Sequence, residues 1–139
     1  MNEELINKIL EGIAKDEGTE GRAVALEGGG STRGYGITTI AEGLKKALSF
    51  SNLNADEMSD KDLARQIVIY NIGEMKKDMG EETWNNLPDQ MKIVASDQYY
   101  NSGKLFDGFK DKNKTWVECS QKCHKDVVTK NYAVGYYTN

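Results

Sequence analysis

The residue whose type and surroundings best suit acid–base chemistry is Glu17, which closes a helix-like segment and is followed by Gly18. Beyond it the chain becomes rich in glycine, with six of its fourteen glycines inside sixteen residues. These six are Gly21, Gly28, Gly29, Gly30, Gly34 and Gly36. The carboxylate lies where a helix meets a glycine-rich segment with few side chains. It can therefore exchange protons with a ligand that lies between the helix and this segment. The stretch from Glu17 to Thr38 therefore predicts a site for acid–base catalysis.

Around this glutamate the sequence predicts a small β lobe. Residues 28–31, Gly-Gly-Gly-Ser, favour a hairpin loop, because glycine reaches positive φ without steric cost. The flanking runs, residues 22–26 and 32–37, are short enough to be strands, and a third short strand is expected near residues 37–40. The β lobe is therefore expected over about residues 18–40.

The remainder of the chain shows helical patterning. Leu5, Ile6, Ile9, Leu10 and Ile13 recur with a period near 3.6, which predicts an amphipathic helix over residues 2–16. Further helices are expected from about residue 39, then over residues 59–79, 81–86, 88–102 and 115–130, with glycines at 80 and 103 as stop signals. The expected fold is α+β: a single domain, residues 1–139, with a β-hairpin or three-stranded sheet and a helical lobe formed by residues 1–17 and 41–130.

Composition and charge exclude some classes of function. The chain has 139 residues, a net charge of -4 and a pI near 5.1, which argues against a nucleic-acid binder, since phosphate binding normally needs a basic patch. No run approaches the roughly 20 apolar residues of a membrane span, so no membrane insertion is expected. The acidic, amphipathic N-terminus does not resemble a signal peptide. We therefore expect a protein made in the cytoplasm.

No metal or cofactor is predicted. Cys119 and Cys123 are four residues apart, which places them on one helix face as small core residues. His124 points to a different face, and the sequence holds no further cysteine or histidine. A structural zinc ion wants four such ligands, so a zinc site is not expected. A single histidine without a matched serine or cysteine also argues against a nucleophile triad.

The order of these motifs resembles a known family. A helix that ends in Asp16-Glu17-Gly18, followed by a predicted hairpin and by Thr32-x-Gly-Tyr-Gly, is similar to the phage-type lysozymes, the endolysins and muramidases of the T4 lysozyme superfamily. Glu17 and Thr32 are fifteen positions apart, which is the spacing of that family's catalytic Glu and Thr. Residues 29–32 and 36–38 also resemble a neighbouring group of phage and bacterial muramidases.

The resemblance covers roughly residues 5–130, since residues 91–109 are similar to the superfamily's central helix and the loop after it. Three positions depart from the family's pattern. Leu26 stands where the hairpin carboxylate is usual, with Glu27 one position later, and Ile37 stands where a histidine is common. The family's arginine-rich C-terminal helix has no counterpart.

The resemblance implies a muramidase that hydrolyses the bond between N-acetylmuramic acid and N-acetylglucosamine in peptidoglycan. It assigns Glu17 as the general acid and Thr32 as the residue that orients a water molecule, while Glu27 is either the second carboxylate or a solvated hairpin residue. Arg33 and Tyr35 are expected to contact sugar or peptide, or to cover the hairpin. Substrate-binding candidates on the far wall are Tyr100 and Asn101, although Asn101 could equally cap a helix.

Two other functions remain open at this point. A lytic transglycosylase needs the acid but no second carboxylate, which is compatible with Leu26 in the hairpin position. A catalytically inactive lysozyme-like protein would bind glycan or form part of a virion. In each case we expect a monomer that reaches the cell wall or periplasm through holin-type release, or that is carried in the virion.

Overall fold

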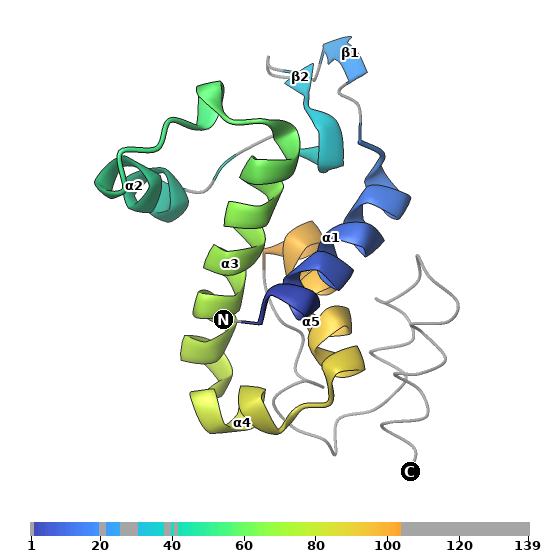
Figure 1. The fold of residues 1–139 in the computed structure, drawn as a ribbon, viewed down its shortest axis with the longest axis vertical. Coiled ribbons are helices and arrows are strands. Elements are labelled where there is room, and N and C mark those ends of the chain that lie inside the picture. The colour runs from blue at the N-terminus through green and yellow to red at the C-terminus, as the bar shows by residue number, and fades with distance from the viewer. Residues whose placement is uncertain (1, 20–21, 26–30, 38–39, 41, 104–139) are drawn as a thin grey trace. The chain divides into compact units, whose positions relative to one another are not determined.

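The computed structural model describes residues 2–19, 22–25, 31–37, 40 and 42–103 (Figure 1). The chain divides into two compact units, Met1–Tyr70 and Asn71–Asn139. The elements in chain order are α1 (Glu3–Glu17), β1 (Arg22–Ala25), β2 (Ser31–Thr32), the 3-10 turn η1 (Gly34–Gly36), α2 (Glu42–Phe50), the 3-10 turn η2 (Ala55–Glu57), α3 (Asp60–Met79), α4 (Glu81–Asn86) and α5 (Asp89–Ser102). The boundary between the units falls within α3. That the chain is a single domain stays a prediction.

Helix α1 positions the candidate acid, and its ends follow from local chemistry. The Asn2 side chain accepts a hydrogen bond from the Leu5 N–H at 3.1 Å, which caps the first turn. At the other end Gly18, with φ 81°, stops the helix and donates its N–H to the Ala14 carbonyl at 2.9 Å. The predicted helix over residues 2–16 is confirmed, and Glu17 is its last residue.

The other predicted helices in the described part of the chain are also confirmed. Helix α3 begins after Ser59, whose hydroxyl accepts the Asp62 N–H at 3.1 Å, and it ends before Gly80. Pro88 directly precedes α5, which ends at Gly103 in a left-handed conformation, φ 73°. Capping side chains and glycines thus define the helix ends where the sequence places them.

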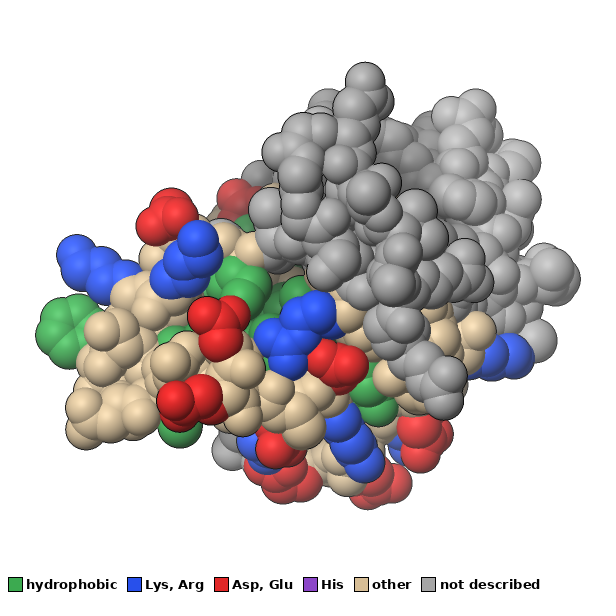
Figure 2. Space-filling view, turned by 90° about the horizontal axis from the view of Figure 1, so that it is seen from above, with side chains coloured by type: hydrophobic (Ala, Val, Ile, Leu, Met, Phe, Trp, Pro, Cys, Tyr) green, Lys and Arg blue, Asp and Glu red, His purple; other side chains and the backbone are tan. Residues whose placement is uncertain are grey.

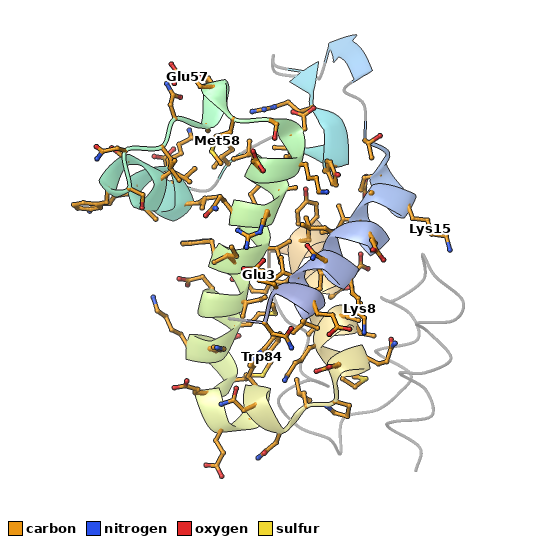
Figure 3. All side chains as sticks on the ribbon, viewed as in Figure 1. Glu3, Lys8, Lys15, Glu57, Met58 and Trp84 are labelled. Atoms are coloured by element: carbon orange, nitrogen blue, oxygen red, sulfur yellow. The ribbon has the colours of Figure 1, made fainter. Side chains whose placement is uncertain are left out.

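Each unit has its own set of buried apolar residues. In the first unit these are Leu5, Ile6, Ile9, Leu10, Ile13, Tyr35, Ile37, Leu44, Leu48, Leu63, Ala64 and Val68. In the second unit they are Ile72, Met75, Trp84, Leu87, Met91, Val94 and Ala95. Within the first unit α1 and α3 are also joined by an ion pair between Glu3 and Arg65 (Figure 3 labels Glu3). No helix in the part of the chain that the structure describes is long and apolar enough to cross a membrane.

The prediction of an α+β fold is wrong, because 81% of the described structure is helical and its class is all-α. The expected β lobe over residues 18–40 is reduced to an irregular antiparallel pairing of β1 with β2, in which Arg22 faces Thr32 and Ala25 faces Ser31. Two strands of four and two residues cannot form a sheet layer, since a sheet needs about three strands with an apolar face.

The second predicted strand run, residues 32–37, is interrupted by a tight turn. Directly after β2 the chain forms η1, in which Tyr35 has φ 63° and Gly36 has φ 68°. Positive φ angles curl the backbone, so the chain leaves the extended conformation that a strand over residues 32–37 would need. Of the expected third strand near residues 37–40, Ile37 is extended, with φ -74° and ψ 113°, but neither it nor residue 40 belongs to a strand. Residues 38, 39 and 41 lie outside the described residues. Figure 1 shows this turn between the C-terminal end of α1 and the N-terminal end of α3.

Candidate functional site

The Glu17 side chain lies directly on the backbone of Gly36. A Cβ atom built at Gly36 would be 2.8 Å from Glu17 Oε2 and 3.1 Å from both Cδ and Cγ of the glutamate. Any side chain at this position would therefore displace the carboxylate. The positive φ of Gly36 demands glycine for a second, independent reason. Glu17 itself is half-buried, so part of it stays accessible.

The turn that carries Gly36 is tied back to the end of α1. The Tyr35 N–H donates to the Gly18 carbonyl at 2.7 Å, one residue beyond Glu17. A second bond, from the Arg33 N–H to the Ile37 carbonyl at 2.9 Å, closes the turn on itself. Tyr35 is held in the left-handed region, a conformation that costs a residue with a side chain about 1–2 kcal/mol. Strain of this kind persists only where the surroundings enforce it, and it is concentrated at functional sites.

Arg33 anchors the other end of the turn through hydrogen bonds. Arg33 donates from Nε to Asp60 Oδ1 at 2.7 Å, from Nη1 to the Ala55 carbonyl at 3.0 Å and from Nη2 to the Met58 carbonyl at 2.7 Å. The second oxygen of Asp60 accepts the Gly34 N–H at 3.2 Å. Figure 3 labels Met58 in the connector that leads into α3. We call Arg33, Asp60 and their two carbonyl partners the arginine clamp.

The clamp gives Arg33 contacts that differ from those predicted for it. All three guanidinium nitrogens donate to protein acceptors, so in this structure the group supports the turn. A contact between Arg33 and substrate stays a prediction. Asp60 is not among the site residues that the sequence predicted. The two partners are 27 residues apart, and no local pattern joins them.

Space at Gly34 is limited in the same way as at Gly36. A Cβ atom there would collide with the Thr19 carbonyl oxygen and would lie 2.8 Å from Asp60 Oδ2. The carbonyl belongs to the backbone and cannot rotate away. The two glycines of the Gly-Tyr-Gly motif therefore allow α1, the turn and the start of α3 to approach one another closely.

The structure describes the remaining predicted site residues to different extents. Thr32 is in β2, and its side chain lies outside what is described. Glu27 lies outside the described residues altogether. Tyr100 is half-buried on α5 in the second unit, where Asn101 is also located but without a described side chain. The structure thus brings together Glu17, Tyr35 and Arg33, and the roles of all seven residues stay predictions.

Among the described residues, no group of three or more His, Cys, Asp or Glu side chains is arranged to hold a metal ion. Cys119, Cys123 and His124 lie outside the described residues. Figure 2 shows acidic and basic side chains side by side on the visible face of the described part. That face carries no broad field of one sign that would attract or repel a charged polymer.

Comparisons of the chain with protein-family models, with curated proteins and with solved structures find no match. The resemblance to phage-type lysozymes therefore rests on the motifs of the sequence alone. The geometry around Glu17 is the independent ground on which a function can be proposed.

Proposed function

We propose that this protein is a glycoside hydrolase of bacterial peptidoglycan in which Glu17 is the general acid. The observation that carries the proposal is the contact between the Glu17 carboxylate and the bare backbone of Gly36. A glycine in the left-handed region, a strained tyrosine beside it and a clamp behind it form a support that keeps one carboxylate in place. Such positioning of a catalytic group by rigid elements is what proton transfer to a substrate requires.

In the proposed reaction the bond between the anomeric carbon of N-acetylmuramic acid and the bridging oxygen breaks. Glu17 donates its proton to the departing oxygen, and a water molecule supplies the hydroxyl group that the anomeric carbon receives. Thr32 is proposed to orient this water. Glu27 is proposed to act as the base that takes the water's proton, which would invert the configuration at the anomeric carbon.

A lytic transglycosylase is the second candidate, and the arginine clamp favours it. Besides Glu17, the carboxylate that the described residues place against the turn is Asp60, the first residue of α3, and its two oxygens already accept from Arg33 and Gly34. Asp60 is therefore poorly suited to activate a water molecule. In a transglycosylase Glu17 gives its proton to the departing oxygen, and its carboxylate then takes the proton of the muramic acid 6-hydroxyl as that hydroxyl attacks its own anomeric carbon. No second carboxylate is then needed, and no water is consumed.

Muropeptide mass spectrometry tests both candidates. Purified peptidoglycan is incubated with the wild-type protein and with Glu17→Gln, and the products are separated and weighed. Reducing muropeptides from the wild type alone would support the hydrolase, and 1,6-anhydro products would support the transglycosylase. Intact glycan after incubation with folded wild-type protein would overturn both and leave a binding or virion role.

A further inference from the structure

A hollow of about 290 Å³ lies beside Tyr35 in the first unit. Its walls come from α1, from the Gly-Tyr-Gly turn and from the first turn of α3. The residues that line it are Asn7, Leu10, Glu11, Ala14, Tyr35 and Lys61. Typical small-molecule sites have volumes of roughly 300–1,000 Å³, so this hollow accepts one small chemical group rather than a long segment of polymer.

The hollow has an apolar floor and a charged rim. Leu10 and Tyr35 are buried, with 3% and 7% of their surfaces exposed, whereas Asn7, Glu11 and Lys61 are exposed. Asn7 and Glu11 are four residues apart and therefore share one face of α1. In the part of the chain that the structure describes, no hydrogen bond or ion pair engages the side chains of these three rim residues. Their donors and acceptors are available to a ligand.

The two rim charges are opposite in sign, and this selects the ligand. A simple anion would be attracted by the Lys61 ammonium but repelled by the Glu11 carboxylate, and a simple cation would meet the reverse. A group that carries both charges close together satisfies both side chains. The Asn7 amide can donate or accept, so it can bond to either end of such a group.

We propose that this hollow binds an α-amino-acid head group, in which an ammonium and a carboxylate are attached to the same carbon. The carboxylate pairs with Lys61, the ammonium pairs with Glu11, and the attached aliphatic chain packs over Leu10 and Tyr35. In peptidoglycan this head group is the free end of a diamino acid in an uncrosslinked stem peptide. The inference rests on the proposed function for the source of the group, because Tyr35 is the neighbour of Gly36, on which Glu17 lies.

Binding is tested with the full chain and a probe that contains no sugar. The probe is the tripeptide L-Ala-γ-D-Glu-meso-diaminopimelate, and the matched probe is the same tripeptide acetylated on the distal amine, which removes one charge. Titration calorimetry and amide chemical shifts report the affinity and the location. We expect the free tripeptide to bind at least tenfold more tightly than the acetylated one, with shifts confined to the lining residues. Equal affinity of the two probes would overturn the proposal.

Substitutions of the lining residues show whether the tripeptide binds in the hollow. Lys61→Met and Glu11→Gln are each expected to weaken binding of the free tripeptide at least fivefold. Lys46→Met and Glu57→Gln make the same charge changes at exposed positions away from the hollow and should leave binding unchanged. Binding that survives both lining substitutions, in variants shown to be folded by circular dichroism, would also overturn the proposal.

The result of the binding experiment does not depend on whether the protein cleaves peptidoglycan. If wild-type protein leaves peptidoglycan intact but binds the tripeptide through Lys61, the proposed function fails and the binding site stands. If peptidoglycan is cleaved and the tripeptide binds no better than its acetylated form, the binding site fails and the proposed function stands.

Discussion

The two ends of the turn from Arg33 to Gly36 are held in different ways. At the Arg33 end, charge-assisted hydrogen bonds join an arginine, a carboxylate and two carbonyl groups. At the Gly36 end, a carboxylate lies against a backbone that has no side chain. The first arrangement holds the chain together, and in the proposed function the second leaves the acid where a substrate can meet it. We therefore expect changes at the Arg33 end to affect stability and changes at the Gly36 end to affect activity.

Glu17→Gln is expected to have the largest effect. The amide has the shape of the carboxylic acid but cannot deliver its proton, and removal of a general acid typically costs about 10²–10⁴-fold in rate. The free energy of unfolding should change by less than about 1 kcal/mol, because the substitution is nearly isosteric. Muropeptide release and urea denaturation measure the two quantities. Glu57→Gln, at an exposed position, is the matched control.

Gly36→Ala tests the Gly36 end while residue 17 stays a glutamate. The new Cβ would push Glu17 aside and would force alanine into positive φ, so we expect a loss of about 1–3 kcal/mol in stability and about a hundredfold in activity. Gly12→Ala is the opposite case, since nothing lies within 4 Å of its Cβ in the interior of α1. There alanine should stabilise by about 0.5–1 kcal/mol. Full activity of Gly36→Ala would show that the contact does not position the acid.

Arg33→Ala tests the other end. Because the side chains of Arg33 and Asp60 are 29% and 33% exposed, we expect a loss of about 1–3 kcal/mol rather than the larger cost of a buried pair. Arg33→Lys should lie between wild type and alanine, since one ammonium cannot reproduce three separate donors. Activity per folded molecule should fall less than for Gly36→Ala.

A matched control for the arginine clamp is Arg65→Ala. Arg65 pairs with Glu3, whose side chain is 62% exposed, and surface pairs contribute about 0–1 kcal/mol. A larger stability loss for Arg65→Ala than for Arg33→Ala, measured by urea denaturation, would contradict the role given to the clamp.

The smallest effect is expected for Phe50→Ser. This ring is 81% exposed and lies at the end of α2, outside both ends of the turn. Its replacement should change the free energy of unfolding by less than about 0.5 kcal/mol and should leave muropeptide release unchanged. A marked loss of activity would instead place Phe50 in contact with the substrate.

Among the described residues, the sequence predicted the helices well because their signals are local, and the helix expected over residues 115–130 lies outside them. Asn2 and Ser59 cap the helices that begin after them, and Gly18, Gly80 and Gly103 end helices within a residue of the expected positions. The sheet was overpredicted for a related reason. Glycine density shows that the chain bends, but it does not distinguish a hairpin loop from glycines needed for close approach, as at 34 and 36.

The candidate site could be predicted only in part. Helix periodicity placed Glu17 at the end of α1, and that placement is confirmed. The arginine clamp could not be foreseen, since it joins residues 27 positions apart through atoms that only the fold brings together. The positive φ of Tyr35 was equally hidden, because an aromatic residue carries no intrinsic preference for the left-handed region.

Two successive hydrogen bonds between α1 and the turn have a consequence for the dynamics of the site. The Tyr35 amide is bonded to the Gly18 carbonyl, and the Gly18 amide is bonded to the Ala14 carbonyl. We therefore expect the last turn of α1 and the Gly-Tyr-Gly turn to open as one cooperative unit. In hydrogen–deuterium exchange the Tyr35 amide should exchange at about the rate of the Gly18 amide, much more slowly than an amide in an open loop. Fraying of α1 would then release Glu17 and its glycine support at the same moment.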